Sequence, residues 1–212
     1  MDKQIREALK NYVAEKYEGY DGLYSIGEII NLFLCNELNL GRLLSDCADY
    51  CSKDFDSKRA IEYLKAALLI EPERHMLLTD IAKLYWQFGK KKKTFHYLNK
   101  AIEKAPDCID TLLVKSTVLL EMERYDEAID ACNTAIASKP NYSEAYLNKA
   151  KIFMATAKYD EALENSLKAL ELDKFNKEIP ELIAEIYYVH FQNEACALEY
   201  LAIAENTTAL PF

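Results

Sequence analysis

Three prolines, Pro72, Pro106 and Pro140, follow one another at a spacing of 34 residues. The stretch YDEAIDACNTAIASKP at 125–140 is echoed 34 positions later by YDEALENSLKALELDK at 159–174. A fixed period of roughly 20–50 residues indicates a chain built from stacked copies of one small unit. Because each copy buries its apolar face only against its neighbours, this period constrains the fold more than any other feature of the sequence.

Units of 34 residues can be numbered so that the three prolines stand at position 32. The units are then 41–74, 75–108, 109–142 and 143–176, followed by a degenerate unit at 177–210. Small residues recur at positions 8, 20 and 27, where two helices approach closely; position 8 reads Ala48, Ala82, Ser116, Ala150 and Ala184. These helical spacings predict a first and a second antiparallel helix in each unit, with a turn near positions 14–17 that Gly89 marks in its unit.

This pattern resembles that of the tetratricopeptide repeat family, which has the same period, small residues at positions 8, 20 and 27, and proline at position 32. The resemblance covers at least residues 41–176, although Lys174 replaces the proline and Thr94 a small residue. It implies an all-α fold, a right-handed superhelical solenoid of antiparallel helix pairs. Residues 1–40 fit the frame loosely as a divergent N-terminal helical pair, and 177–212 as a degenerate C-terminal repeat with a short tail.

The composition narrows the choice of partners. A formal net charge of −9 and a pI near 5.0 argue against nucleic acid as a partner. The sequence has no apolar stretch of membrane-spanning length and begins without an apolar signal core, which predicts a cytoplasmic protein with no membrane partner.

No arrangement of residues indicates catalysis. Cys47 and Cys51 stand four residues apart, but at packing positions of a first helix, and Cys132 and Cys196 fall at or near packing positions of second helices. Neither a C-x-x-C nor an H-E-x-x-H motif occurs. We therefore predict a protein that is not an enzyme and that carries no cofactor or metal.

The resemblance implies that positions 2, 5, 6, 9, 12 and 13 of the first helices line a concave groove for a peptide. In one well-known use, Lys and Asn at such positions clamp the C-terminal carboxylate of Hsp70 or Hsp90. When three consecutive units of this chain are aligned with the clamp, no alignment places cationic donors at all the positions that require them. The alignment that starts at the second unit holds Thr79, Lys83, Val114, Glu144 and Asn148. This is therefore not expected to be a carboxylate-clamp Hsp70/Hsp90 binder.

Acidic residues outnumber basic ones at the predicted groove positions, with apolar residues among them. This arrangement favours a basic segment of another protein, anchored by a few large apolar side chains. We predict a protein-binding adaptor or chaperone with these peptide-binding residues: Asp80, Lys83, Trp86, Asp110, Leu113, Val114, Leu120, Glu144, Leu147, Asn148 and Lys151. The alternative is that the acidity only reflects the acidic chain and that some leucines pack between neighbouring helices.

The last predicted helix, NEACALEYLAIAEN at 193–206, is apolar over most of its circumference. Exposed apolar surface of this extent marks an interface. One hypothesis is a homodimer or other assembly, with Leu198, Leu201 and Phe212 at the interface and the protein acting as a structural scaffold subunit. A second is that the tail folds back, with Leu210 and Phe212 covering the helix; a third is a frayed, partly exposed end.

Overall fold

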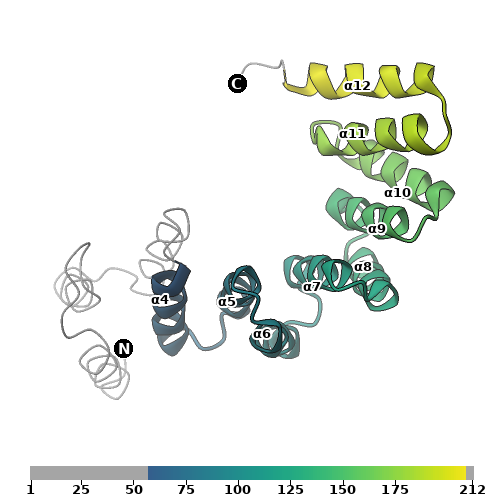
Figure 1. Cartoon of the computed structure of the whole chain (residues 1–212). Helices are drawn as coiled ribbons and strands as arrows, with labels where there is room; N and C mark the ends of the chain where they lie inside the picture. The colour runs from purple at the N-terminus through teal and green to yellow at the C-terminus, as the bar shows by residue number, and fades with distance from the viewer. Residues whose placement is uncertain (1–56, 209–212) are drawn as a thin grey trace. The chain divides into compact units, whose positions relative to one another are not determined.

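The computed structural model describes residues 57–208, which belong to two compact units divided between Pro106 and Asp107. The described residues form helices joined by short turns and contain no strand (Figure 1). The predicted N-terminal pair at 1–40, the first helix of unit 41–74 and the tail residues Leu210 and Phe212 lie outside the described residues.

The N-terminal unit contains three described helices, α4 (Ser57–Ile70), α5 (His75–Gln87) and α6 (Lys91–Lys104). Helix α5 packs against both α4 and α6. Its turn into α6 places Gly89 at φ 64°, a left-handed conformation that glycine adopts without a steric penalty. Small and aliphatic side chains fill the core, among them Ala60, Leu64, Ala82, Leu98 and Ala101.

The C-terminal unit continues the same alternation. It comprises α7 (Ile109–Glu121), α8 (Tyr125–Ser138), α9 (Ser143–Ala155), α10 (Tyr159–Leu172), α11 (Glu178–Glu185), the π-helix η1 (Ile186–His190) and α12 (Glu194–Thr208). Each of these α-helices packs on the next in the chain. The small residues of the repeat lie where second helices meet their neighbours: Ala128, Ala135, Ala162 and Ala169 are fully buried.

In each helix pair that the structure describes completely, the turn between the two helices has one residue in the left-handed region. These residues are Gly89, Glu123, Ala157 and Gln192. The first three stand 34 positions apart, whereas Gln192 follows Ala157 by 35. The last helix pair therefore contains one residue more than the repeat predicts.

Hydrogen bonds locate this extra residue. Lys158 N donates to Phe153 O, five residues back, and the earlier turns repeat this bond, but Asn193 N donates to Tyr187 O, six residues back. The insertion coincides with η1, whose wider turn accommodates an added residue. It shifts α12 by one residue, so Ala197 and not Cys196 lies at the buried place equivalent to Ala162; Cys196 is half-buried.

Candidate protein-binding surfaces

The first helices of the C-terminal unit carry an acidic surface. We call the side chains at positions 2, 5, 6, 9, 12 and 13 of α7, α9 and the α11–η1 segment the first-helix face. Its exposed acids are Asp110, Glu121, Glu144, Glu178, Glu181 and Glu185. Its one cation, Lys151, forms an ion pair with Glu178 at 2.6 Å, so the face is predominantly negative.

Two predicted peptide-binding acids surround one phenol. The Tyr142 hydroxyl donates a hydrogen bond to Asp110 Oδ1 at 3.3 Å. Burial, together with the nearby carboxylates of Glu144 and Asp110, raises the pKa of Tyr142 to about 12. The phenol is therefore neutral at physiological pH and acts as a hydrogen-bond donor within this acidic surface.

Other predicted peptide-binding residues of this unit take part in its internal packing. The Asn148 amide donates to Ser116 Oγ at 3.2 Å and Thr117 Oγ1 at 3.4 Å, which links α9 to α7. Leu113 and Leu147 are 7% and 3% exposed, so their side chains belong mainly to the core. Val114 and Leu120 are half-buried. The apolar surface available on this face is thus smaller than the sequence pattern suggests.

The remaining predicted peptide-binding residues lie on α5 of the N-terminal unit. Lys83 Nζ pairs with Asp80 Oδ1 at 3.1 Å, and Trp86 is half-buried one turn further along the helix. The structure thus groups these three residues on one helix. A role for them in peptide binding remains a prediction.

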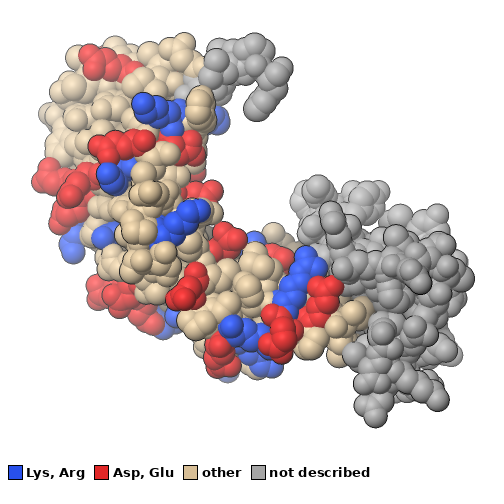
Figure 2. Space-filling model, turned by 180° about the vertical axis from the view of Figure 1, so that it is seen from behind, with Lys and Arg blue, Asp and Glu red and all other residues tan. Residues whose placement is uncertain are grey.

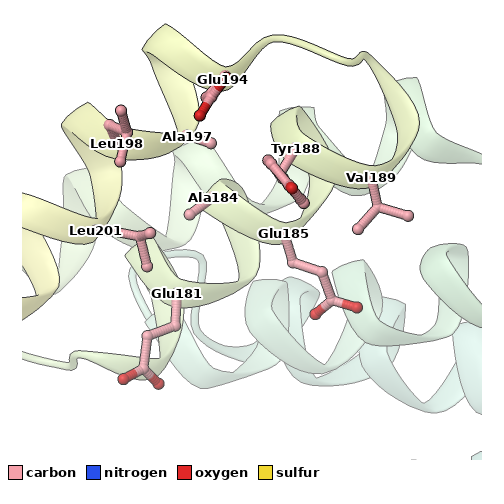
Figure 3. Close-up of a pocket in the computed structure, with 9 residues that line it drawn as sticks. All are labelled: Glu181, Ala184, Glu185, Tyr188, Val189, Glu194, Ala197, Leu198 and Leu201. Atoms are coloured by element: carbon pink, nitrogen blue, oxygen red, sulfur yellow. The ribbon is translucent and has the colours of Figure 1, made fainter.

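A groove with an apolar floor lies between α11–η1 and α12. It has a volume of about 340 Å³ and is lined by Glu181, Ala184, Glu185, Tyr188, Val189, Glu194, Ala197, Leu198 and Leu201 (Figure 3). We call it the terminal groove. Tyr188 and Leu198 are 63% and 59% exposed. Such exposure of large apolar side chains side by side is characteristic of an interaction surface.

Carboxylates border the terminal groove. In Figure 3, Ala184, Tyr188 and Leu201 lie between the carboxylates of Glu181 and Glu185 on one side and that of Glu194 on the other. Among the described residues, no cationic side chain lines the groove. Figure 2 shows that the end of the C-terminal unit that carries α11 and α12 is largely uncharged on the face drawn there, as expected for apolar exposure.

Aromatic stacking holds η1 in place at the groove. The Tyr159 and His190 rings stack with their centroids 3.5 Å apart, and those of Tyr187 and Tyr200 stack at 5.7 Å. These contacts fix η1 to α10 and α12, and they leave Tyr188 and Val189 exposed. Sequence reasoning identified Leu198 and Leu201 but missed Val189. The 35-residue spacing from Ala162 to Ala197 is the signal that would have revealed the insertion beside it.

The described residues hold no cluster of His, Cys, Asp and Glu suited to a metal ion. Cys132 is fully buried, and burial raises the pKa of its thiol to about 11. No helix within residues 57–208 has the length and apolar character needed to cross a membrane.

Comparison with known proteins supports the repeat interpretation. The sequence model of the tetratricopeptide repeat family matches residues 119–186. A search of the curated proteins finds no match.

Solved structures share the fold at low sequence identity. MamA from Desulfovibrio magneticus RS-1 is 17% identical with a TM-score of 0.63, covering 79% of this chain and 94% of its own. PilF from Pseudomonas aeruginosa is 18% identical with a TM-score of 0.71, covering 81% and 78%. A thermophilic tetratricopeptide-repeat protein of Thermus thermophilus is 18% identical with a TM-score of 0.67, covering 79% and 91%. The expected all-α solenoid is thereby confirmed.

The period of the sequence, the helix pairs and the family match at 119–186 agree with one another. Residues 119–186 thus match the tetratricopeptide repeat, and the described helix pairs share the all-α solenoid fold of the solved structures.

Proposed function

We propose that this protein is a non-enzymatic interaction module that binds a partner protein through the terminal groove, as a subunit of a larger assembly. The observation that carries this proposal is the exposed apolar floor of the groove, with Tyr188, Leu198 and Leu201 in contact with solvent. Burying such side chains against a partner stabilises a complex by about 25 cal/mol per Å² of apolar surface. Fully desolvated aromatic and aliphatic anchors carry most of the binding energy at protein interfaces.

The repeat supplies a second reason to propose that a partner binds in the terminal groove. In the preceding pair, α9 and α10, the surface equivalent to the terminal groove is covered by α11. Leu163 of α10 packs there against the cluster that contains Ile179 and Ile183. Leu198 stands 35 residues after Leu163, at the equivalent place on α12, yet it is exposed. The terminal groove is thus the surface on which the next first helix of a solenoid would pack.

The first-helix face is a second candidate site. Its exposed Asp110 and Glu144 and its single, already paired cation favour a basic segment of a partner protein. Because Leu113 and Leu147 are largely buried, the part of this face on α7 and α9 offers fewer apolar anchors than the terminal groove. We therefore place it second, as an adaptor or chaperone surface whose binding depends on charge.

One experiment separates the two sites. Full-length tagged protein is compared with Leu198→Glu and with the double variant Asp110→Lys/Glu144→Lys in affinity capture read by mass spectrometry. We expect Leu198→Glu to lose partners that the double variant keeps. Partners kept by Leu198→Glu and lost from the double variant would assign binding to the first-helix face. Circular dichroism of both variants controls for folding, since all three positions are exposed.

A further inference from the structure

We propose that the occupant of the terminal groove is a basic amphipathic helix of a partner protein, docked as the next first helix, with a Lys or Arg paired to Glu185. This inference rests on the proposed function and specifies the chemistry of its partner. It comes from comparing the terminal groove with the equivalent interior surface, where α11 is the occupant.

The interior surface shows what a docked helix contributes. Helix α11 inserts Ile179 and Ile183, both fully buried, with Leu182 packed beside them against Leu147 and Ala169. Its charged contact is made by Glu178, whose carboxylate pairs with Lys151 Nζ of α9 at 2.6 Å. A helix docked in this way therefore presents a charge at position 2 and apolar residues at positions 3, 6 and 7.

The charge at position 9 of the first helix has the opposite sign at the terminal groove. Lys151 occupies position 9 of its unit, and the residue at position 9 of the last unit is Glu185. A helix that repeats the docking of α11 would bring its second residue to Glu185. A glutamate there would meet a like charge, whereas Lys or Arg would restore the ion pair with its polarity reversed.

The other carboxylates of the terminal groove, those of Glu181 and Glu194, also favour a basic partner. Glu181 occupies the place of Leu147 one unit earlier, so an interior core position is acidic at the end. Glu181 is paired with Lys177 at 3.4 Å, but within the described residues no cation pairs with Glu185 or Glu194. A wholly apolar helix would desolvate these two carboxylates without compensation, which is costly.

Charge also weighs against two other occupants. A second copy of this chain seated face to face would bring the same carboxylates together, on a protein whose formal net charge is already −9. Residues 209–212, Ala-Leu-Pro-Phe, contain no cation to pair with Glu185 or Glu194. A basic helix satisfies both the apolar floor and the acidic border.

The chain's own α11 supplies the probe. Two fluorescent peptides carry the sequence of residues 177–190 with Glu181→Gln and Glu185→Gln. The lysine probe adds Glu178→Lys, and the glutamate probe keeps Glu178. Because the probes differ at one position, the ratio of their affinities reports the charge that the groove prefers there. Fluorescence anisotropy with the full chain measures both dissociation constants.

We expect the wild-type chain to bind the lysine probe about tenfold more tightly than the glutamate probe. Glu185→Lys should reverse this order, because it recreates the interior Lys–Glu pair. The matched control, Lys151→Glu, changes the charge at the interior site and should leave the preference for lysine intact. The preference should also shrink as salt is added, since these charges border an open groove.

Six results would overturn the inference, and the first four concern the two probes. These are equal affinity of the wild-type chain for both probes, no binding of the lysine probe up to about 1 mM, an unchanged order in Glu185→Lys, and a preference lost in Lys151→Glu. A dimer in light scattering that Leu198→Glu abolishes would identify a second copy as the occupant. Binding of the lysine probe that strengthens about tenfold on deletion of 209–212 would identify the tail instead.

The proposed function and the inference of a basic helix can be refuted independently of each other. Partners that Leu198→Glu loses while the probes show no charge preference would leave the terminal groove as the binding site and refute only the basic helix. Reversal of the preference by Glu185→Lys, with every cellular partner kept by Leu198→Glu, would refute the proposed function and retain the groove's preference for a basic helix.

Discussion

The same chemical change is expected to lower the free energy of unfolding by very different amounts at a buried and at an exposed position of the C-terminal end. Ile183→Ala and Leu198→Ala each remove three side-chain carbons. Ile183 is fully buried in the cluster with Leu147 and Ala169, so the transfer cost is about 2.4 kcal/mol at ~0.8 per methylene. The cavity left in a packed core raises the loss to about 3–4 kcal/mol. Leu198 is 59% exposed, so its truncation costs roughly 1 kcal/mol and leaves no enclosed cavity.

Urea denaturation followed by circular dichroism measures both free energies of unfolding, and thermal melts provide a second reading. For a chain of 212 residues, each kcal/mol lowers the midpoint temperature by about 2–4 °C. Ile183→Ala should therefore melt about 6–16 °C below wild type, and Leu198→Ala within about 4 °C. Equal losses would refute the reasoning, because they would mean that Leu198 is covered in the free protein. Ile183→Val, at about 0.5–1.5 kcal/mol, checks that the larger loss follows the number of carbons removed.

Three further outcomes follow from burial and charge. Because the folded pKa of Tyr142 is about 12 against 10.0 for a free phenol, stability present below pH 10 should fall as pH rises from 10 to 12, and Tyr142→Phe should reduce this fall in urea titrations. Cys132, with a pKa of about 11, should resist thiol reagents at pH 8 in the native protein and react once urea unfolds it; rapid native labelling, mapped by mass spectrometry, would contradict its burial. Ala162→Leu should cost about 1–3 kcal/mol of unfolding free energy by overpacking, whereas exposed Ala155→Leu should change it by less than about 0.5 kcal/mol.

The period of the sequence predicts most of the described fold because each helix pair packs against its neighbours in the same way. The spacing of small residues placed the close approaches at Ala128 and Ala162, which are fully buried. It also located the turns at Glu123 and Ala157, which adopt positive φ although neither is a glycine. Composition alone would have pointed only to Gly89, so it is the repeat that identifies the other two turns.

Two features could not be read from the pattern. A first helix packs on its own second helix and also on the next pair, so a leucine at position 5 satisfies the helical period whether it faces a groove or a neighbour. Leu113 and Leu147 face neighbours and are largely buried. The inserted residue at η1 was missed because a π-helical turn keeps the chain helical while it moves every later residue by one position.

The terminal groove differs from a surface adapted only to water. A terminal repeat that is to be soluble by itself needs a polar outer face. In the terminal groove only some of the equivalent interior residues are replaced by acidic ones. Glu181 and Glu185 stand where the preceding unit has Leu147 and Lys151. Leu198, however, keeps the leucine that Leu163 provides one unit earlier. Solubility alone would favour a polar residue at Leu198 as well, since its side chain is mostly exposed. On the proposed docking of a partner helix, carboxylates beside a retained apolar floor would select by charge which helix can be buried there, which is how an interface discriminates among partners.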